Sequence, residues 1–139
     1  METVRRILQD KINDRIAPSK AVLIFGARRV GKTVMMRKIV DSYPGRTMML
    51  NGEDYDTLAL LENRSVANYR HLLEGIDLLA IDEAQNIPQI GSILNLIVDE
   101  IPGISVLASG SSSFDLLNKT DEPLVGCSTQ FLLTPFSQR

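Results

Sequence analysis

A glycine-rich segment that follows an apolar run is the clearest chemical motif in the sequence. It fits the pattern G-x-x-x-x-G-K-[S/T], known as Walker A, and consists of Gly26, Ala27, Arg28, Arg29, Val30, Gly31, Lys32 and Thr33. Glycines in this pattern let successive backbone N–H groups face a polyphosphate, and the helix that follows adds its positive N-terminal end. The lysine adds a mobile positive charge, and the threonine hydroxyl is a suitable ligand for Mg²⁺. The segment predicts a phosphate-binding loop, to which we also assign Val34.

The two arginines of this segment have a less favoured role. Arg28 and Arg29 occupy its variable positions, where side chains usually point away from the phosphates, although a guanidinium is a good phosphate ligand. The alternative for the whole segment is a glycine-rich turn that binds nothing. An apolar run before it and a helical pattern after it favour the phosphate loop.

Two adjacent carboxylates follow a second apolar run, at residues 78–81. Asp82 is expected at the tip of that strand, where it binds Mg²⁺ directly or through water. Glu83, one residue further, is expected to reach a water aligned for attack on a γ-phosphorus. Transfer to a bound hydroxyl needs no such water, so the pair favours hydrolysis over phosphoryl transfer to a small acceptor. The alternative for both residues is a turn-forming role.

Three further polar positions lie near these motifs, and two of them have two interpretations. Asn51 either restrains Glu83 through its amide or, the favoured interpretation, forms a turn. Gln85 either contacts a water or phosphate or lies in a solvent-facing turn. Asp54 and its acidic neighbours are expected to cap the helix that follows them.

The elements that must position these residues alternate between strands and helices. The chain has 139 residues, which fits one domain over 1–139 with an N-terminal helix within 1–17 and a core over 20–133. The alternation predicts an α/β fold with an open parallel sheet that binds ligands at the carboxyl ends of its strands. We expect strands at 21–25, 47–51, 78–81, 104–108 and 128–133, and helices at 1–16, 32–42, 54–61, 65–73, 90–101 and 114–118.

Charge and hydropathy exclude several classes of partner. Fifteen basic and seventeen acidic residues leave a net charge of −2, so neither nucleic acid nor an anionic membrane surface is expected as a partner. The apolar stretches are far shorter than the roughly 20 residues that a membrane helix needs. The single Cys127 fits a reducing compartment, and we expect a cytoplasmic protein.

Three runs together resemble a known family. The phosphate loop, then Ile81-Asp82-Glu83-Ala84-Gln85, then Leu107-Ala108-Ser109-Gly110-Ser111-Ser112-Ser113, closely resemble the prokaryotic AAA-type ATPases whose ATPase module normally precedes a C-terminal domain of unknown function. The resemblance implies a three-layer P-loop fold with a five-stranded parallel sheet of order 5-1-4-3-2, and ATP with Mg²⁺ as cofactors. By the same likeness Ser109 is a polar sensor, with Ser111 as the second choice and an ordinary serine-rich loop as the alternative.

The sequence departs from the family pattern near its end. Cys127 stands where the family usually has arginine, which removes a cation that could stabilise charge on the transferred phosphoryl group. The chain ends soon after the fifth predicted strand, so we expect a truncated module whose unpaired strand edge favours self-association. Two functions follow: an ATPase that drives or switches an unknown protein partner, or a nucleotide-binding interaction module with little or no turnover.

Overall fold

The apolar runs of the sequence form the strands of one sheet. The computed structural model describes residues 2–18, 20–26, 31–110 and 128–132, and the structural statements below concern these residues. The elements in chain order are α1 (Glu2–Arg15), β1 (Lys20–Phe25), α2 (Lys32–Ser42), β2 (Thr47–Asn51), α3 (Tyr55–Glu62), α4 (Val66–Leu72), β3 (Leu78–Asp82), the 3₁₀ helix η1 (Ala84–Asn86), α5 (Ile90–Glu100), β4 (Ser105–Gly110) and β5 (Ser128–Leu132).

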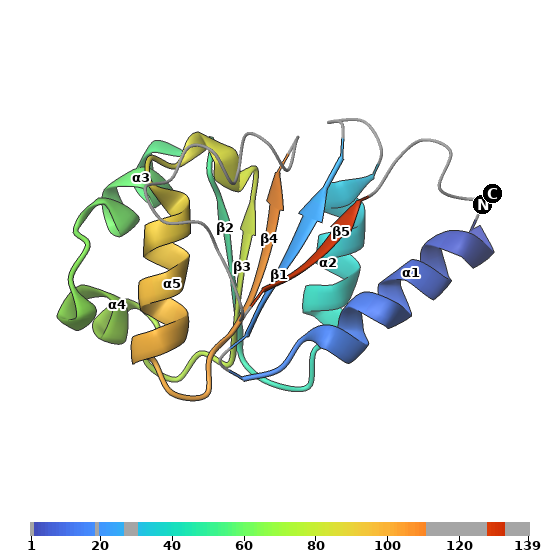
Figure 1. The fold of residues 1–139 in the computed structure, drawn as a ribbon, viewed down its shortest axis with the longest axis horizontal. Coiled ribbons are helices and arrows are strands. Elements are labelled where there is room, and N and C mark those ends of the chain that lie inside the picture. Colours follow the sequence, from blue (N-terminus) through green and yellow to red (C-terminus); the bar gives the residue numbers. More distant parts are fainter. Residues whose placement is uncertain (1, 19, 27–30, 111–127, 133–139) are drawn as a thin grey trace.

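All neighbouring strands of the sheet pair in parallel. Their order is β2-β3-β4-β1-β5, so β4 lies between β1 and β3 (Figure 1). The predicted α/β fold with a parallel sheet is confirmed. Read from β5, the order is 5-1-4-3-2. Because all these strands run in one direction, their carboxyl ends share one edge of the sheet.

Helices cover both faces of the sheet, which explains why the central strands β3, β4 and β1 are mostly apolar and almost entirely buried. α1 and α2 lie on one side, and α3, α4 and α5 on the other (Figure 1). Successive side chains of a strand alternate between the faces. In β1, Val22 and Ile24 pack in the cluster that includes Met36 of α2, whereas Leu23 packs in the cluster that includes Leu94 of α5.

The structure differs from the predicted elements at two places near the site, the end of β4 and the segment after β3. The strand predicted to stop at residue 108 runs to Gly110, because the Gly110 carbonyl accepts a bond from Gly26 N–H and extends the β1–β4 pairing. Ser109 therefore lies inside β4 rather than in the loop after it. The turn of η1 after β3 was not predicted. The helix predicted at 114–118 lies outside the described residues.

Within the described residues, no helix has both the length and the apolar character that crossing a bilayer requires.

Candidate functional site

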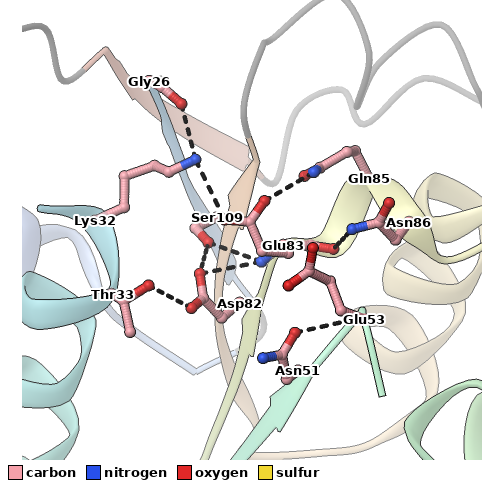
Figure 2. A network of polar contacts seen from close by, with 10 residues as sticks. All are labelled: Gly26, Lys32, Thr33, Asn51, Glu53, Asp82, Glu83, Gln85, Asn86 and Ser109. Carbon is pink, nitrogen blue, oxygen red and sulfur yellow. Dashed lines mark hydrogen bonds and ion pairs between the residues drawn. The ribbon is translucent and has the colours of Figure 1, made fainter. Parts of the chain in front are cut away.

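The predicted site residues that the structure describes meet at the carboxyl edge of the sheet. β4 brings Ser109 beside Ile24 of β1, and the register of β2 and β3 pairs Asn51 with Asp82. α2 begins at the same edge and carries Lys32 and Thr33 (Figure 2). Residues 27–30, Ser111 and Cys127 lie outside the described part of the chain.

The start of α2 is built to receive an anion. Gly31 precedes the helix with φ 89° and ψ 20°, a left-handed conformation that glycine adopts without steric cost. Gly31 has no side chain to cap the helix, and no side-chain cap is recorded for α2 among the described residues. The first N–H groups of a helix have no partner within it and carry partial positive charge, so they bind phosphate well. Val34, in the same first turn, is 54% exposed.

Lys32 connects the phosphate loop to the acidic pair. Its Nζ donates a 2.8 Å hydrogen bond to the Gly26 carbonyl and lies 3.7 Å from Glu83 Oε2. The side chain is 1% exposed. A buried ammonium needs such partners, because an unpaired charge away from water is costly. The lysine is thus held by groups of the chain itself.

Thr33 and Asp82 form the second contact between the two motifs. Thr33 Oγ1 donates a 2.6 Å hydrogen bond to Asp82 Oδ2 (Figure 2). The other carboxylate oxygen, Oδ1, accepts from Ser109 Oγ and from the Glu83 N–H at 3.1 Å. Ser109 Oγ also accepts from that N–H at 3.1 Å. A cavity of about 390 Å³ opens beside Thr33 and Asp82, with Arg37 of α2 also in its wall.

These groups fit a magnesium ion bound with a phosphate. Thr33 and Asp82 offer hard oxygen ligands from two elements, and Mg²⁺ takes one or two protein oxygens together with waters and substrate phosphates. Asp82 is buried, and among the contacts of its carboxylate in the described residues none is to a cation. Its oxygens are therefore suitable for a metal ion. The described residues hold no cluster of three or more His, Cys, Asp or Glu that would form an all-protein metal cage.

Glu83 adopts an unusual backbone conformation. Its φ of 52° and ψ of 46° lie in the left-handed region, which non-glycine residues rarely occupy. The end of β2 packs closely against this turn: Gly52 N–H donates to the Asp82 carbonyl at 2.7 Å, and a Cβ on Gly52 would lie 2.2 Å from the Glu83 carbonyl oxygen. Strained residues cluster at functional sites, where surrounding structure holds them in place.

The structure shows what the three further polar positions contact. Asn51 Oδ1 accepts from Glu53 N–H at 2.9 Å, so the favoured turn-forming role is confirmed. Asp54 accepts from the Asp56 N–H at 2.9 Å and caps α3, as predicted. Gln85 is not in a solvent-facing turn.

The Gln85 side chain is buried in η1, and its Nε2 donates a 2.8 Å hydrogen bond to Glu83 Oε1 (Figure 2). Sequence reasoning missed this contact. A polar residue immediately after the acidic pair gives only a weak signal for it, because glutamine is mostly exposed in proteins.

Comparisons with known proteins bear on the family and the fold of the chain. Two curated relatives, the uncharacterized proteins Mb2031c of Mycobacterium bovis and Rv2008c of Mycobacterium tuberculosis, are each 30% identical to the chain over 124 residues. These matches cover 88% of this chain and 26% of each relative, so the chain spans only part of their length.

A solved katanin chain, from work on the structural basis of katanin self-assembly, is similar in fold. Its TM-score is 0.60 at 15% identity, with 92% of this chain and 50% of that chain covered. The family model described as AAA domain matches residues 18–139, nearly the whole sequence. With its P-loop sequence, its parallel sheet and this match, the chain belongs to the AAA domain family.

Proposed function

We propose that the chain binds ATP with Mg²⁺ and hydrolyses the bond to the γ-phosphate, a cycle that drives or switches a partner protein or a second copy of the chain. The observation that carries this proposal is the polar network at the carboxyl edge of the sheet. It joins Lys32, Thr33, Asp82, Glu83 and Ser109 through contacts of 3.7 Å or less. Each has the chemistry that one part of the reaction requires.

Binding begins at the start of α2. The first N–H groups of α2 and the ammonium of Lys32 hold the phosphates of ATP. In exchange, Lys32 gives up its contacts with the Gly26 carbonyl and with Glu83. The phosphates bring more negative charge than the single Glu83 carboxylate, so the exchange is favourable for the ammonium.

Thr33 and Asp82 would hold the magnesium ion. When bound, Mg²⁺ neutralises charge that develops on the phosphate oxygens. Thr33 would supply its hydroxyl oxygen and Asp82 its carboxylate as the oxygen ligands that Mg²⁺ prefers. Ser109 keeps Asp82 in place through its bond to Oδ1.

Glu83 is the proposed general base. Once Lys32 moves to the phosphates, Glu83 Oε2 is released from the ion pair and accepts a proton from the attacking water. The water oxygen forms a bond to the γ-phosphorus, and the bond from that phosphorus to the bridging oxygen breaks. The products are ADP and inorganic phosphate. General base catalysis of this kind contributes about 10²–10⁴-fold to a rate.

One observation favours the alternative of a binding module with little turnover. Both Glu83 oxygens have partners in this structure, Gln85 at Oε1 and Lys32 at Oε2. If ATP does not displace Lys32 from Glu83, the base stays occupied and the nucleotide is only bound.

Phosphate release separates the two functions. Wild-type protein and Glu83→Gln are compared at saturating ATP and Mg²⁺, with calorimetry of a non-hydrolysable analogue to show that both bind. We expect the substitution to lower the rate by about 10²-fold or more. Equal rates would refute the role of Glu83, and tight binding without release by wild-type protein would establish the binding module.

A further inference from the structure

Gln85 supplies a buried amide to the carboxylate that the proposed reaction uses as its base. It lies in η1, two residues after Glu83, and its side chain is buried. The 2.8 Å bond from Nε2 to Glu83 Oε1 joins two side chains that are both shielded from water. A hydrogen bond to a charged group in such a setting is stronger than one between neutral groups.

The two oxygens of the Glu83 carboxylate have different partners. Oε2 faces Lys32 at 3.7 Å, on the side of the phosphate loop, whereas Oε1 faces Gln85 (Figure 2). In the proposed cycle Lys32 leaves Glu83 to bind phosphates, whereas the cycle assigns Gln85 no contact with the phosphates. The amide therefore keeps Oε1 occupied and leaves Oε2 directed toward the phosphates.

The turn that carries Gln85 is itself firmly held. The Glu83 carbonyl accepts bonds from Asn86 N–H at 3.2 Å and Asn86 Nδ2 at 3.3 Å, and Ile87 N–H donates to the Ala84 carbonyl at 3.0 Å. The amide donor and its acceptor therefore sit on one short, closed turn. Without the bond, the glutamate side chain would regain rotamers that do not point at the phosphates.

We propose that Gln85 is a positioning residue that orients the Glu83 carboxylate for attack by water on ATP. This inference rests on the proposed ATP hydrolysis. Gln85 does not need to touch the nucleotide or the water, so its loss should lower kcat and leave nucleotide affinity unchanged. In this role Gln85 acts through Glu83, so the effect on kcat should vanish when Glu83 cannot act as a base.

The test compares Gln85→Met, which keeps a long side chain but has no N–H donor, with wild-type protein. We expect kcat for phosphate release to fall about 10-fold or more, as loss of a hydrogen bond to a charged group predicts. The dissociation constant for a non-hydrolysable ATP analogue should change less than about 2-fold, within the scatter of a surface substitution. Gln9→Met, in α1, is the matched control and should leave both quantities unchanged.

A second variant and a second background make the test decisive. Gln85→Glu replaces Gln85→Met as the test if the latter does not fold. The glutamate has almost the same shape as glutamine but places a carboxylate against Glu83, so kcat should fall about 10-fold or more here too. In the Glu83→Gln background, Gln85→Met should cause no further loss.

Each outcome bears on one proposal or both. An unchanged kcat in the Gln85 variants, or a loss that persists in the Glu83→Gln background, would overturn the role of Gln85 alone. Binding of the analogue without any phosphate release by wild-type protein would overturn the proposed hydrolysis, and the role of Gln85 with it.

Discussion

Gly52 should be indispensable to the turn that carries Glu83, although it has no side chain to act in any reaction. A methyl group at this position would lie 2.2 Å from the Glu83 carbonyl oxygen and 3.0 Å from its carbonyl carbon. Both are backbone atoms, so no side chain can rotate away. Gly52 is not among the described glycines with positive φ, so the cost of Gly52→Ala is steric rather than conformational.

The required displacement sets the size of the effect. Ordinary contacts between carbon and a carbonyl oxygen are about 3.3–3.6 Å, so the turn or the end of β2 must move by roughly 1 Å. Overpacking of this kind typically costs about 1–3 kcal/mol in stability. A 1 Å displacement of a reacting group can lower a rate by about 10²-fold. Gly52→Ala should therefore lower both the free energy of unfolding and the rate of ATP hydrolysis.

Urea unfolding and phosphate release measure the two effects in the same samples. Gly103→Ala is the matched control, since a Cβ there meets nothing within 4 Å but φ is +81°. That variant should lose stability through backbone strain, by about 1 kcal/mol, and keep the full rate. If Gly52→Ala unfolds at the same urea concentration as wild type and hydrolyses ATP at the same rate, the inference that the end of β2 packs closely against the Glu83 turn is refuted.

Two further substitutions test separate parts of the molecule. Thr33→Ala removes the hydroxyl that contacts Asp82, so hydrolysis should need a higher magnesium concentration to reach half its maximal rate. Thr33→Ser keeps the hydroxyl and should behave as wild type. An unchanged magnesium titration in Thr33→Ala would contradict the magnesium role. The pKa of Tyr69 is raised because burial disfavours its charged form, an effect that the nearby Arg64 partly offsets. Above about pH 10 the unfolded chain therefore loses this proton first and the free energy of unfolding falls. Tyr69→Phe should weaken that decline. At neutral pH the substitution should lower the free energy of unfolding by about 1–3 kcal/mol, because the Leu61 carbonyl loses its 2.8 Å hydrogen bond from the Tyr69 hydroxyl. Unfolding curves from pH 8 to 11 that match wild type would refute both statements.

Local sequence patterns predicted the parts of the site that depend on neighbouring residues. The glycine spacing before Lys32 and Thr33 predicted a loop that leads into a helix, and α2 begins at Lys32. The apolar run before Asp82 predicted a buried strand, and parallel strands necessarily bring their carboxyl ends to one edge. The fold class therefore predicted that Asp82 and the phosphate loop share one edge of the sheet, and the strand order implied by the family resemblance placed them close together on it.

Contacts that depend on tertiary packing could not be predicted in this way. The ion pair between Lys32 and Glu83 joins groups far apart in the sequence. The left-handed conformation of Glu83 has no sequence signal, because such turns usually use glycine or asparagine. Gln85 is buried in the 3₁₀ helix that follows this residue, and the need for Gly52 arises from its close approach to the Glu83 backbone.

Binding of ATP is the step on which every proposed role depends, and calorimetry of ATP with Mg²⁺ measures it directly. Wild-type protein should bind, and Lys32→Ala should bind much more weakly, because the variant loses the only described ammonium that contacts both the phosphate loop and Glu83. Lys38→Ala, on an exposed face of α2, serves as the control and should bind as wild type does. Equal affinity in wild-type protein and Lys32→Ala would contradict a phosphate site at the start of α2.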